Sequence, residues 1–361
     1  MSRVFNVAVI GVGIGRSHIV EGYLPNADRF RVKALCDLNE ERMNAVGDEF
    51  AIAQRLTRFE DVLAMGDIDI IDICTPPMLH YPMVMAALRA GKHVICEKPL
   101  VGSLAQVDAV IEEEKRSKGK LMPVFQYRFG NGIEQAKAII DAGIAGKPFM
   151  GTVETLWRRD APYYAVPWRG KWATELGGVL MGHAIHPHDL FTYLMGDIER
   201  VFGRVATRVN PIEVEDTISA SLLMKSGALA SFTATLGSAD DMTRLRLAFE
   251  NVSFESDHAA YNPGEKPWKI QPRNPETAAR IETLLKDWKH VPSRFQTQMR
   301  RFHDALIGAA PLPVTSADSR RSLELVTAFY HSSSTNEDVV LPIGPGHPLY
   351  ESWVPAQFRA A

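Results

Sequence analysis

Cysteine is scarce in this sequence, which has three in 361 residues. Cys36, Cys74 and Cys96 are odd in number, widely spaced and each set in an apolar run that resembles a strand. This pattern argues against a disulfide framework of the kind that stabilises small secreted domains. We therefore expect three buried thiols and a cytoplasmic protein.

The sequence also lacks a long apolar segment and an excess of charge of either sign. No run approaches the ~18 apolar residues of a membrane span, and the N-terminus passes into Phe5–Ile10 without a signal peptide. Acidic residues number 43 and basic residues 40, with no long run of either. We therefore expect no membrane, no nucleic acid, and a small polar molecule as the ligand.

The first part of the chain repeats a short apolar run, a polar turn and an amphipathic stretch, which predicts parallel βαβ units. A length of 361 residues favours two domains, and we place the first, a doubly wound parallel sheet, at residues 1–125. Helices are predicted over Tyr81–Ala90 and Leu104–Lys115. The predicted strands are Val7–Ile10, Val32–Cys36, Ile68–Cys74, His93–Cys96 and Leu121–Phe125.

Residues 126–361 have a different pattern. Alternating apolar and polar residues flank short turns in 217–236 and in 244–254, which predicts two β-hairpins. Late helices are predicted at Arg294–Leu306 and Ser319–Ser332. We therefore expect a C-terminal α+β domain with an open, mostly antiparallel sheet, and we assign substrate binding and oligomerisation to it.

A glycine-rich turn follows the first predicted strand. Such a turn lets a pyrophosphate approach the N-terminus of the next helix, although an ordinary strand-to-helix turn is an alternative, because the third glycine comes one residue early for the dinucleotide fingerprint. Asp37 ends the second strand, where a carboxylate can bind ribose hydroxyls and repel a 2′-phosphate, which favours NAD; helix capping is its alternative role. The turn residues expected at the cofactor are Gly11, Gly13, Ile14 and Gly15.

Two more polar segments follow predicted strands, at the edge where open parallel sheets bind ligands. Thr75, Pro76 and His80 come after the third predicted strand, and Glu97 and Lys98 come directly after the fourth. Prolines end both strands and hold the neighbouring polar groups at this edge. We expect all five residues at the cofactor, with a surface ion pair as the alternative for Glu97 and Lys98.

Together these motifs resemble the Gfo/Idh/MocA family of NAD(P)-dependent oxidoreductases over nearly the whole chain. The family implies a Rossmann domain followed by an open-faced sheet domain, and oxidation of sugars, polyols or their derivatives by hydride transfer to the nicotinamide. The matching segments are the glycine turn ending in His18, Asp37, Thr75-Pro-Pro77 with His80, Glu97-Lys-Pro99, Trp168-Arg169, Gly177-Gly178, His186 and Asp189.

The resemblance also implies roles for single residues. Lys98 matches the family lysine beside the reacting carbon, and His186 matches the catalytic histidine. Trp168 and Arg169 are implied at the cofactor. One departure is Gly182, because family members often carry Asp or Asn four residues before the histidine; either that role is vacant here or His183 fills it.

The stretch from His183 to Asp189 contains three histidines, which raises the question of a metal site. A metal needs ligands that converge on one point, whereas His188 and Asp189 should lie about 100° apart on a helix that begins at Pro187, with His186 just before it. The three cysteines are distant in sequence and add no ligand cluster. We therefore predict no metal.

The same stretch suits acid–base chemistry. We predict that His186 takes the proton of a substrate hydroxyl and that Lys98 stabilises the developing charge on the oxygen. His188 is expected on the helix surface. Asp189 either orients His186 or caps the helix, and His183 either contacts the substrate or makes a structural hydrogen bond.

A sugar pocket needs aromatic faces beside hydrogen-bond donors. Sheet packing and surface charge are the alternatives for each candidate taken singly. The residues expected at the substrate are Lys98, Arg128, Trp157, Tyr163, Lys171, His183 and His186.

The predicted activity is NAD-dependent oxidation of an aldose hydroxyl to a lactone, with D-apiose or a similar small aldose as the best candidate. A polyol or inositol dehydrogenase would need nearly the same residues. An NAD-dependent glycosidase with transient oxidation is another enzymatic alternative, and an NAD-binding redox sensor is a non-enzymatic one. Partly apolar alternation in residues 217–236 predicts a homodimer or homotetramer.

Overall fold

The computed structural model describes residues 3–359 and divides into two compact units. Of the described residues, the first unit contains 3–124 and 295–320, and the second contains 125–294 and 321–359. Residues 295–320, which we expected in the second domain, therefore pack with the first unit. The described helices include none with the length and apolar character that a membrane span requires.

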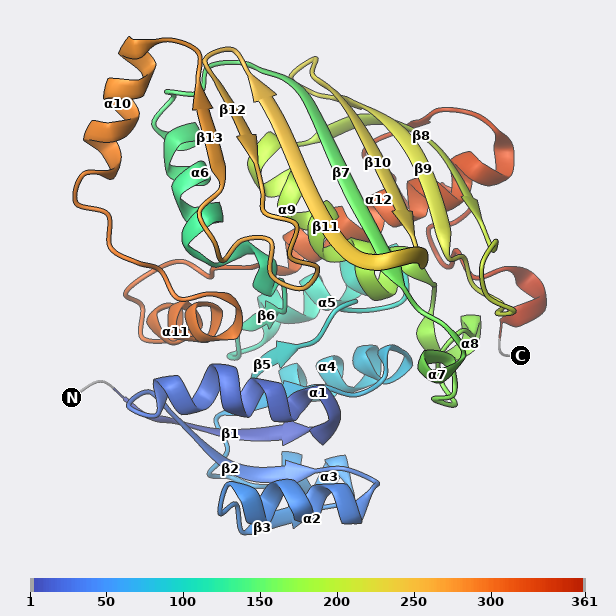
Figure 1. Cartoon of the computed structure of the whole chain (residues 1–361). Helices are drawn as coiled ribbons and strands as arrows, with labels where there is room; N and C mark the ends of the chain where they lie inside the picture. Colours follow the sequence, from blue (N-terminus) through green and yellow to red (C-terminus); the bar gives the residue numbers. More distant parts are fainter. Residues whose placement is uncertain (1–2, 360–361) are drawn as a thin grey trace. The chain divides into compact units, whose positions relative to one another are not determined.

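The first unit is built on a six-stranded parallel sheet in the order β3-β2-β1-β4-β5-β6 (Figure 1). This order is that of a Rossmann fold, so the predicted fold is confirmed. The short β3 was not predicted, because only one of its three residues is apolar. The strands are β1 (Phe5–Ile10), β2 (Phe30–Cys36), β3 (Gln54–Leu56), β4 (Ile70–Ile73), β5 (His93–Cys96) and β6 (Leu121–Pro123). The helices are α1 (Val12–Ser17), α2 (Glu40–Glu49), α3 (Phe59–Leu63), α4 (His80–Arg89), α5 (Leu104–Arg116) and α11 (Arg294–Leu306).

Helix α11 explains why a late segment joins the first unit. Its apolar side chains recur at helical spacing, and Phe295, Met299 and Phe302 are all buried. The Phe295 ring packs 4.4 Å from that of His18, and Met299 lies against Gly22, where a Cβ would collide with its sulfur. The sequence pattern predicts the helix and its apolar face, but not the partner of that face.

The second unit contains an eight-stranded sheet in the order β13-β12-β11-β7-β10-β9-β8-β14. Only the β7–β10 pair is parallel, and both predicted hairpins, β9–β10 and β11–β12, are present. The prediction of a mostly antiparallel sheet is confirmed. The strands are β7 (Pro148–Arg158), β8 (Ile198–Ala206), β9 (Thr217–Met224), β10 (Leu229–Thr235), β11 (Gly237–Phe249), β12 (Val252–Glu255), β13 (Lys269–Pro272) and β14 (Val339–Val340). The helices are α6 (Asn131–Asp141), α7 (Ala161–Tyr164), α8 (Trp172–Glu175), α9 (Ile185–Met195), α10 (Pro275–Leu285) and α12 (Ser316–Thr335), whose first turn belongs to the first unit.

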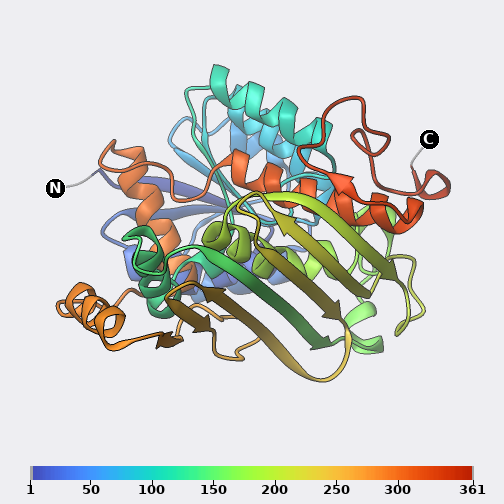
Figure 2. The same cartoon turned by 90° about the horizontal axis from the view of Figure 1, so that it is seen from above.

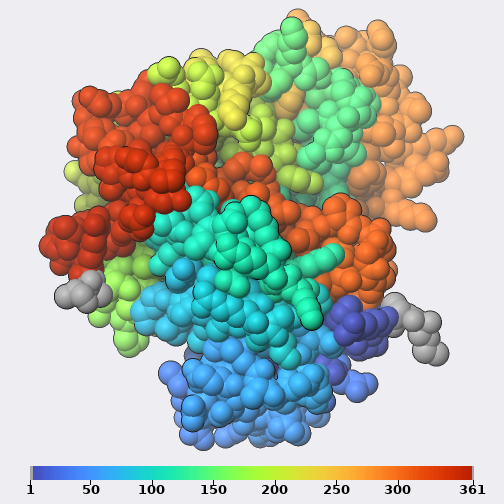
Figure 3. All heavy atoms as spheres, turned by 180° about the vertical axis from the view of Figure 1, so that it is seen from behind, coloured from blue at the N-terminus to red at the C-terminus, as the bar shows by residue number. Residues whose placement is uncertain are grey.

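Helices α9 and α12 cover the same face of this sheet (Figure 2). Phe191 of α9 and Phe329 of α12 both contact Phe232 of β10, and all three rings are completely buried. The C-terminal segment, red in Figure 3, lies beside the yellow strands because β14 pairs with β8. The core of this unit therefore lies between the sheet and the two helices, and α9 carries the predicted catalytic histidine.

Candidate active-site residues

The glycine turn leads from β1 into α1, and its glycines differ in what surrounds them. Gly11 has φ +89°, and a Cβ there would lie 2.7 Å from the carbonyl oxygen of Cys74. A Cβ on Gly15 would lie 2.6 Å from Val9. Gly13 has no such neighbour, and Ile14 is exposed. Gly11 and Gly15 thus permit close packing, while the backbone at Gly13 stays open to a phosphate at the helix N-terminus, which fits the predicted dinucleotide.

Asp37 lies at the carboxyl end of β2 and turns its carboxylate toward this glycine turn. It accepts hydrogen bonds from the backbone N–H groups of Val12 and Asn39, each at 2.8 Å, and from the Arg42 guanidinium at 3.0 and 3.1 Å. The N-cap of α2 is Asn39, whose side chain accepts from the N–H of Arg42. Capping is thus done by Asn39, and Asp37 lies beside the turn, as a ribose ligand would.

His80 joins the two polar segments that follow β4 and β5. Its ring nitrogens lie 2.8 Å from the carbonyl oxygen of Thr75 and 2.7 Å from that of Pro99. The side chain is fully buried, and burial lowers its pKa. Both ring nitrogens of His80 face backbone carbonyl oxygens, and a neutral ring donates a hydrogen bond to one of them, so any contribution of His80 to the cofactor site is made by holding the backbone at Thr75 and Pro99 in place.

Glu97 and Lys98 follow β5 directly. The Glu97 carboxylate is buried, accepts the backbone N–H of Lys98 at 3.0 Å and lies 3.0 Å from Nε2 of His18. Although burial raises the pKa of Glu97, the hydrogen bond and charge of His18 and the charge of Lys98 hold it below its ordinary value. Because Glu97 is buried, the alternative of a surface ion pair is wrong for this residue.

In the second unit the three histidines sit on a π-helical turn (Leu180–Ala184) and on α9, which begins at Ile185, two residues before the predicted start. The His186 ring stacks on Tyr127 at 4.6 Å and meets the edge of Phe125 at 6.2 Å. The expectation that His188 lies on the surface is wrong. His188 is 2% exposed and its ring stacks on Phe232 of the sheet. Burial lowers its pKa to about 3. The expectation failed because the side of α9 that carries His188 is covered by the sheet.

Asp189 pairs with Arg128, which precedes α6. The guanidinium donates to both carboxylate oxygens, at 2.7 and 2.5 Å, and both side chains are almost completely buried. Arg128 also lies over the Tyr193 ring, 4.7 Å from its centre. We predicted Arg128 at the substrate; in the structure it anchors α9 one turn beyond His186.

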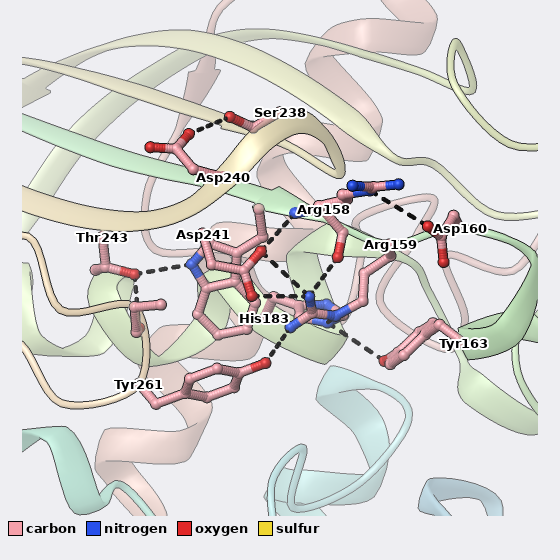
Figure 4. A network of polar contacts seen from close by, with 12 residues as sticks. Arg158, Arg159, Asp160, Tyr163, His183, Ser238, Asp240, Asp241, Thr243 and Tyr261 are labelled. Carbon is pink, nitrogen blue, oxygen red and sulfur yellow. Dashed lines mark hydrogen bonds and ion pairs between the residues drawn. The ribbon is translucent and has the colours of Figure 1, made fainter.

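A polar cluster surrounds His183, with Arg159 at its centre (Figure 4). Arg159 donates to Nε2 of His183 at 3.2 Å, pairs with Asp241 at 3.1 Å and donates to the Tyr261 hydroxyl. Because an arginine only donates, Nε2 of His183 accepts and the ring proton sits on Nδ1. Tyr163 reaches the same nitrogen with its hydroxyl, at 3.3 Å.

Arg159, Asp241 and Tyr261 were not predicted as site residues. Sequence reasoning named Trp157, which does lie in the cluster, with its ring 4.9 Å from that of His183 and its Nε1 donating to Thr243 at 3.0 Å. Alternation along β7, continued one residue past its end at Arg158, would place residue 159 on the same face as Trp157, so Arg159 could have been found by that rule. Asp241 and Tyr261 have no comparable signal.

The predicted segment 168–171 is brought to the cluster in part. The Arg169 guanidinium lies over the rings of Tyr163 and Trp168, at 3.9 and 4.4 Å, and 3.5 Å from a carboxylate oxygen of Glu175. Lys171 is exposed. The Glu175 carboxylate is buried and lies 3.7 Å from where a side chain on Gly182 would begin, so it lies close to the position at which family members often carry Asp or Asn.

Glu215, also not predicted, holds the start of the histidine segment. Its carboxylate accepts the N–H groups of Gly178 and Leu180 at 3.0 Å and the Tyr330 hydroxyl at 2.7 Å. A Cβ on Gly178 would lie 1.7 Å from the Glu215 carbonyl oxygen, which explains that glycine. Burial raises the pKa of Glu215 to about 7.

The histidines do not gather as metal ligands. Among residues 3–359, the group with metal-ligand spacing is His18, Asp72 and Cys74, whose ligand atoms all lie within 4.8 Å of one another. The expectation that no cysteine joins such a cluster is therefore wrong for Cys74. All three cysteines are buried and free of disulfides.

Comparison with known proteins identifies the family. Residues 5–125 match a model described as "Oxidoreductase family, NAD-binding Rossmann fold", and residues 133–255 match the GFO/IDH/MocA C-terminal domain. The predicted NAD-binding oxidoreductase is thereby confirmed.

Several relatives have been named. The chain is 30% identical to myo-inositol 2-dehydrogenase from Thermotoga maritima, over 62% of this chain and 66% of that protein. It is 26% identical to D-apiose dehydrogenase from Paraburkholderia graminis, over 93% of this chain and 90% of that protein. The WlbA dehydrogenase from Bordetella pertussis, solved in complex with NADH and UDP-GlcNAcA, is 25% identical with a TM-score of 0.82, over 95% of this chain and 100% of that chain.

Proposed function

Because this chain belongs to the Gfo/Idh/MocA family of NAD-dependent oxidoreductases, we propose that it oxidises a hydroxyl of a neutral aldose, D-apiose or a similar small aldose, to the lactone. The observation that carries this proposal is the cluster around His183. It combines aromatic rings with several hydrogen-bond donors, and its arginine charges are already matched by carboxylates, Arg159 by Asp241 and Arg169 by Glu175. Such a surface suits hydroxyl groups better than a substrate carboxylate.

The proposed roles follow from the chemistry of each group. His186 accepts the proton of the reacting hydroxyl, for which a neutral imidazole is suited near pH 7. Lys98 donates a hydrogen bond to the same oxygen and stabilises its developing negative charge. NAD, when bound, supplies the acceptor for the hydride that leaves the carbon. Gly11, Gly13, Ile14, Gly15 and Asp37 hold its phosphates and ribose, with Trp168 and Arg169 as further cofactor contacts.

A polyol or inositol dehydrogenase is the second candidate, and the similarity to the Thermotoga maritima inositol enzyme favours it. The base and the lysine would be the same, because they act on one CH–OH group. The two candidates differ in the product, which is a lactone from an aldose and a ketone from an inositol.

The first test is NADH absorbance with purified protein, NAD or NADP, and a panel of aldoses, polyols, inositols and sugar acids that includes apiose. Turnover of one neutral aldose with NAD and release of a lactone supports the proposal. A ketone product from an inositol replaces it with the second candidate. NAD binding without NADH formation from any of these compounds contradicts both, and favours a glycosidase with transient oxidation or a redox sensor.

We also propose that the open face of the second sheet pairs with another copy of the chain. Leu229 stands opposite Met150 on one neighbouring strand and Leu223 on the other, and Leu229 and Met150 are at least half exposed. A contiguous apolar patch of this kind on a sheet favours self-association. Light scattering at micromolar concentration should give the mass of a dimer or tetramer, and a mass of 40.1 kDa would contradict it.

A further inference from the structure

A charged cluster that the proposed mechanism does not use lies buried in the first unit. His18 and Asp72 are completely buried, and Glu97 is 6% exposed. Nδ1 of His18 lies 2.9 Å from an Asp72 oxygen, and Nε2 lies 3.0 Å from a Glu97 oxygen. Ionised carboxylates only accept, so both contacts are hydrogen bonds when the ring carries both protons. Although burial lowers it, the charge of Asp72 and its hydrogen bond keep the pKa of His18 well above the ordinary value.

The backbone at His18 is shaped for this arrangement. Helix α1 widens after Ser17 into a π-helical turn, His18–Tyr23. A π-helical turn has hydrogen bonds between residues five apart, the spacing of His18 and Tyr23, and such turns are frequent at functional sites. The Tyr23 hydroxyl donates to Asp72 at 2.8 Å, so both ends of the turn point at the same carboxylate.

The cluster connects to Lys98 through Glu97. One Glu97 oxygen faces Nε2 of His18, and the other accepts the backbone N–H of Lys98 at 3.0 Å. A chain of contacts thus runs from Asp72 through His18 and Glu97 to the main chain at Lys98. We propose that His18 is a positioning residue that fixes the Glu97 carboxylate and, through it, the backbone from which the Lys98 side chain extends. The catalytic part of this inference rests on the proposed role of Lys98.

A metal ion is the other occupant that this cluster's chemistry allows, since His18, Asp72 and Cys74 have ligand spacing. Two features oppose it. An imidazolium with both N–H groups donating has no lone pair for a metal, and burial raises the pKa of the Cys74 thiol, which keeps it protonated. Elemental analysis of the purified protein should find no stoichiometric zinc or iron; one equivalent, lost in His18→Gln, would overturn the positioning role.

The direct test is amide hydrogen exchange in the segment that follows β5. His18→Gln keeps a donor but cannot reach both carboxylates, so the Lys98 amide should exchange about tenfold faster or more. His93→Gln is the matched control, because His93 is the first residue of β5 and its Nδ1 accepts a hydrogen bond from the backbone N–H of Lys120, outside the cluster. Unchanged exchange at Lys98 in His18→Gln would refute the inference whatever the substrate is.

Turnover then separates positioning from a merely structural role. With a substrate in hand, His18→Gln should lower kcat about tenfold or more and leave the Kd for NADH within about threefold, and Glu97→Gln should lower kcat to a similar extent. The double variant should be no worse than the poorer single variant, since both act on one contact chain. Losses that multiply would contradict the inference. If His18→Gln fails to fold, Tyr23→Phe is the substitute, because it removes only the hydroxyl that donates to Asp72. Tyr23→Phe should give a smaller increase in exchange of the Lys98 amide and a smaller loss of kcat. If neither quantity changes, the inference is contradicted.

If Lys98→Met leaves turnover intact, the proposed function of Lys98 fails, while accelerated exchange in His18→Gln would still support the contact chain. The two failures are therefore distinguishable.

Discussion

The first unit places its candidate residues in short segments that directly follow strands, whereas the second assembles its candidates from elements far apart in the chain. Asp37 and Glu97 each come one residue after a strand. Around His183, by contrast, Arg159, Asp241 and Tyr261 come from three different segments. In a parallel sheet all carboxyl ends lie at one edge, so sequence position alone indicates proximity. In the second sheet, proximity depends on register and on loops.

The comparison predicts its largest effect at His186, which was identified by resemblance. His186→Ala should lower kcat by ~100-fold or more, because the reacting hydroxyl loses its proton acceptor. The Kd for NAD, measured by titration, should change little. His188→Leu is the control on the same helix, since His188 packs against Phe232 in the core. Equal turnover by His186→Ala and the wild type would remove His186 from the mechanism.

The next largest effect is expected at Asp37 in the first unit. Asp37→Ser should raise the Kd for NAD about tenfold or more, because the ribose loses a charged acceptor. It also releases Arg42, which now donates to Asp37 at 3.0 Å, so the affinity for NADP should rise. Calorimetric titration with both nucleotides measures this reversal.

Adding Arg42→Ala to Asp37→Ser is the control, and it should abolish the gain for NADP. Wild-type protein that already binds NADP as tightly as NAD would show that Asp37 does not select the cofactor.

A smaller effect is expected from neighbouring arginines on β7 and after it. Arg159→Met should raise the KM for the sugar about tenfold, because His183 and Tyr261 lose a shared charged donor. Arg158→Met should leave KM unchanged, since Arg158 is two-thirds exposed and pairs with Asp160 at 3.3 Å. If the two variants behave alike, the cluster around His183 does not bind the substrate.

These residues also show how much of the structure can be predicted from the sequence. The parallel sheet of the first unit, the mostly antiparallel sheet of the second and both hairpins follow from the periodicity of the sequence. His188 was misplaced because the sequence of α9 does not reveal that several sides of this helix are buried. Helix α11 was predicted at its observed bounds but assigned to the wrong unit, because an apolar face does not name its partner.

The residues missed altogether share one property: their partners are distant in the chain. Asp72 and His18 are 54 positions apart, and Glu215 and Gly178 are 37 apart. Neither pair belongs to a local motif, and each carboxylate reads as an ordinary polar residue in its own segment. Only the register of the sheets and the path of the loops brings them together.

The smallest expected effect is a change in the pH dependence of stability at Glu215, one of these unpredicted residues, which holds the N-terminal end of the histidine segment. Burial raises its pKa from an ordinary value of 4.5 to about 7. The folded protein then binds this proton more tightly than the unfolded chain, so the contribution to stability is present below pH 4.5 and is lost as the pH rises toward 7. Glu215→Gln keeps one acceptor oxygen but cannot titrate. Urea unfolding at about pH 5 and about pH 8 should show that the wild type loses roughly 2 kcal/mol more stability than the variant between these conditions. Equal losses in the two proteins would mean that Glu215 is ionised throughout this range, and that the hydrogen bonds it accepts from Gly178, Leu180 and Tyr330 outweigh its burial.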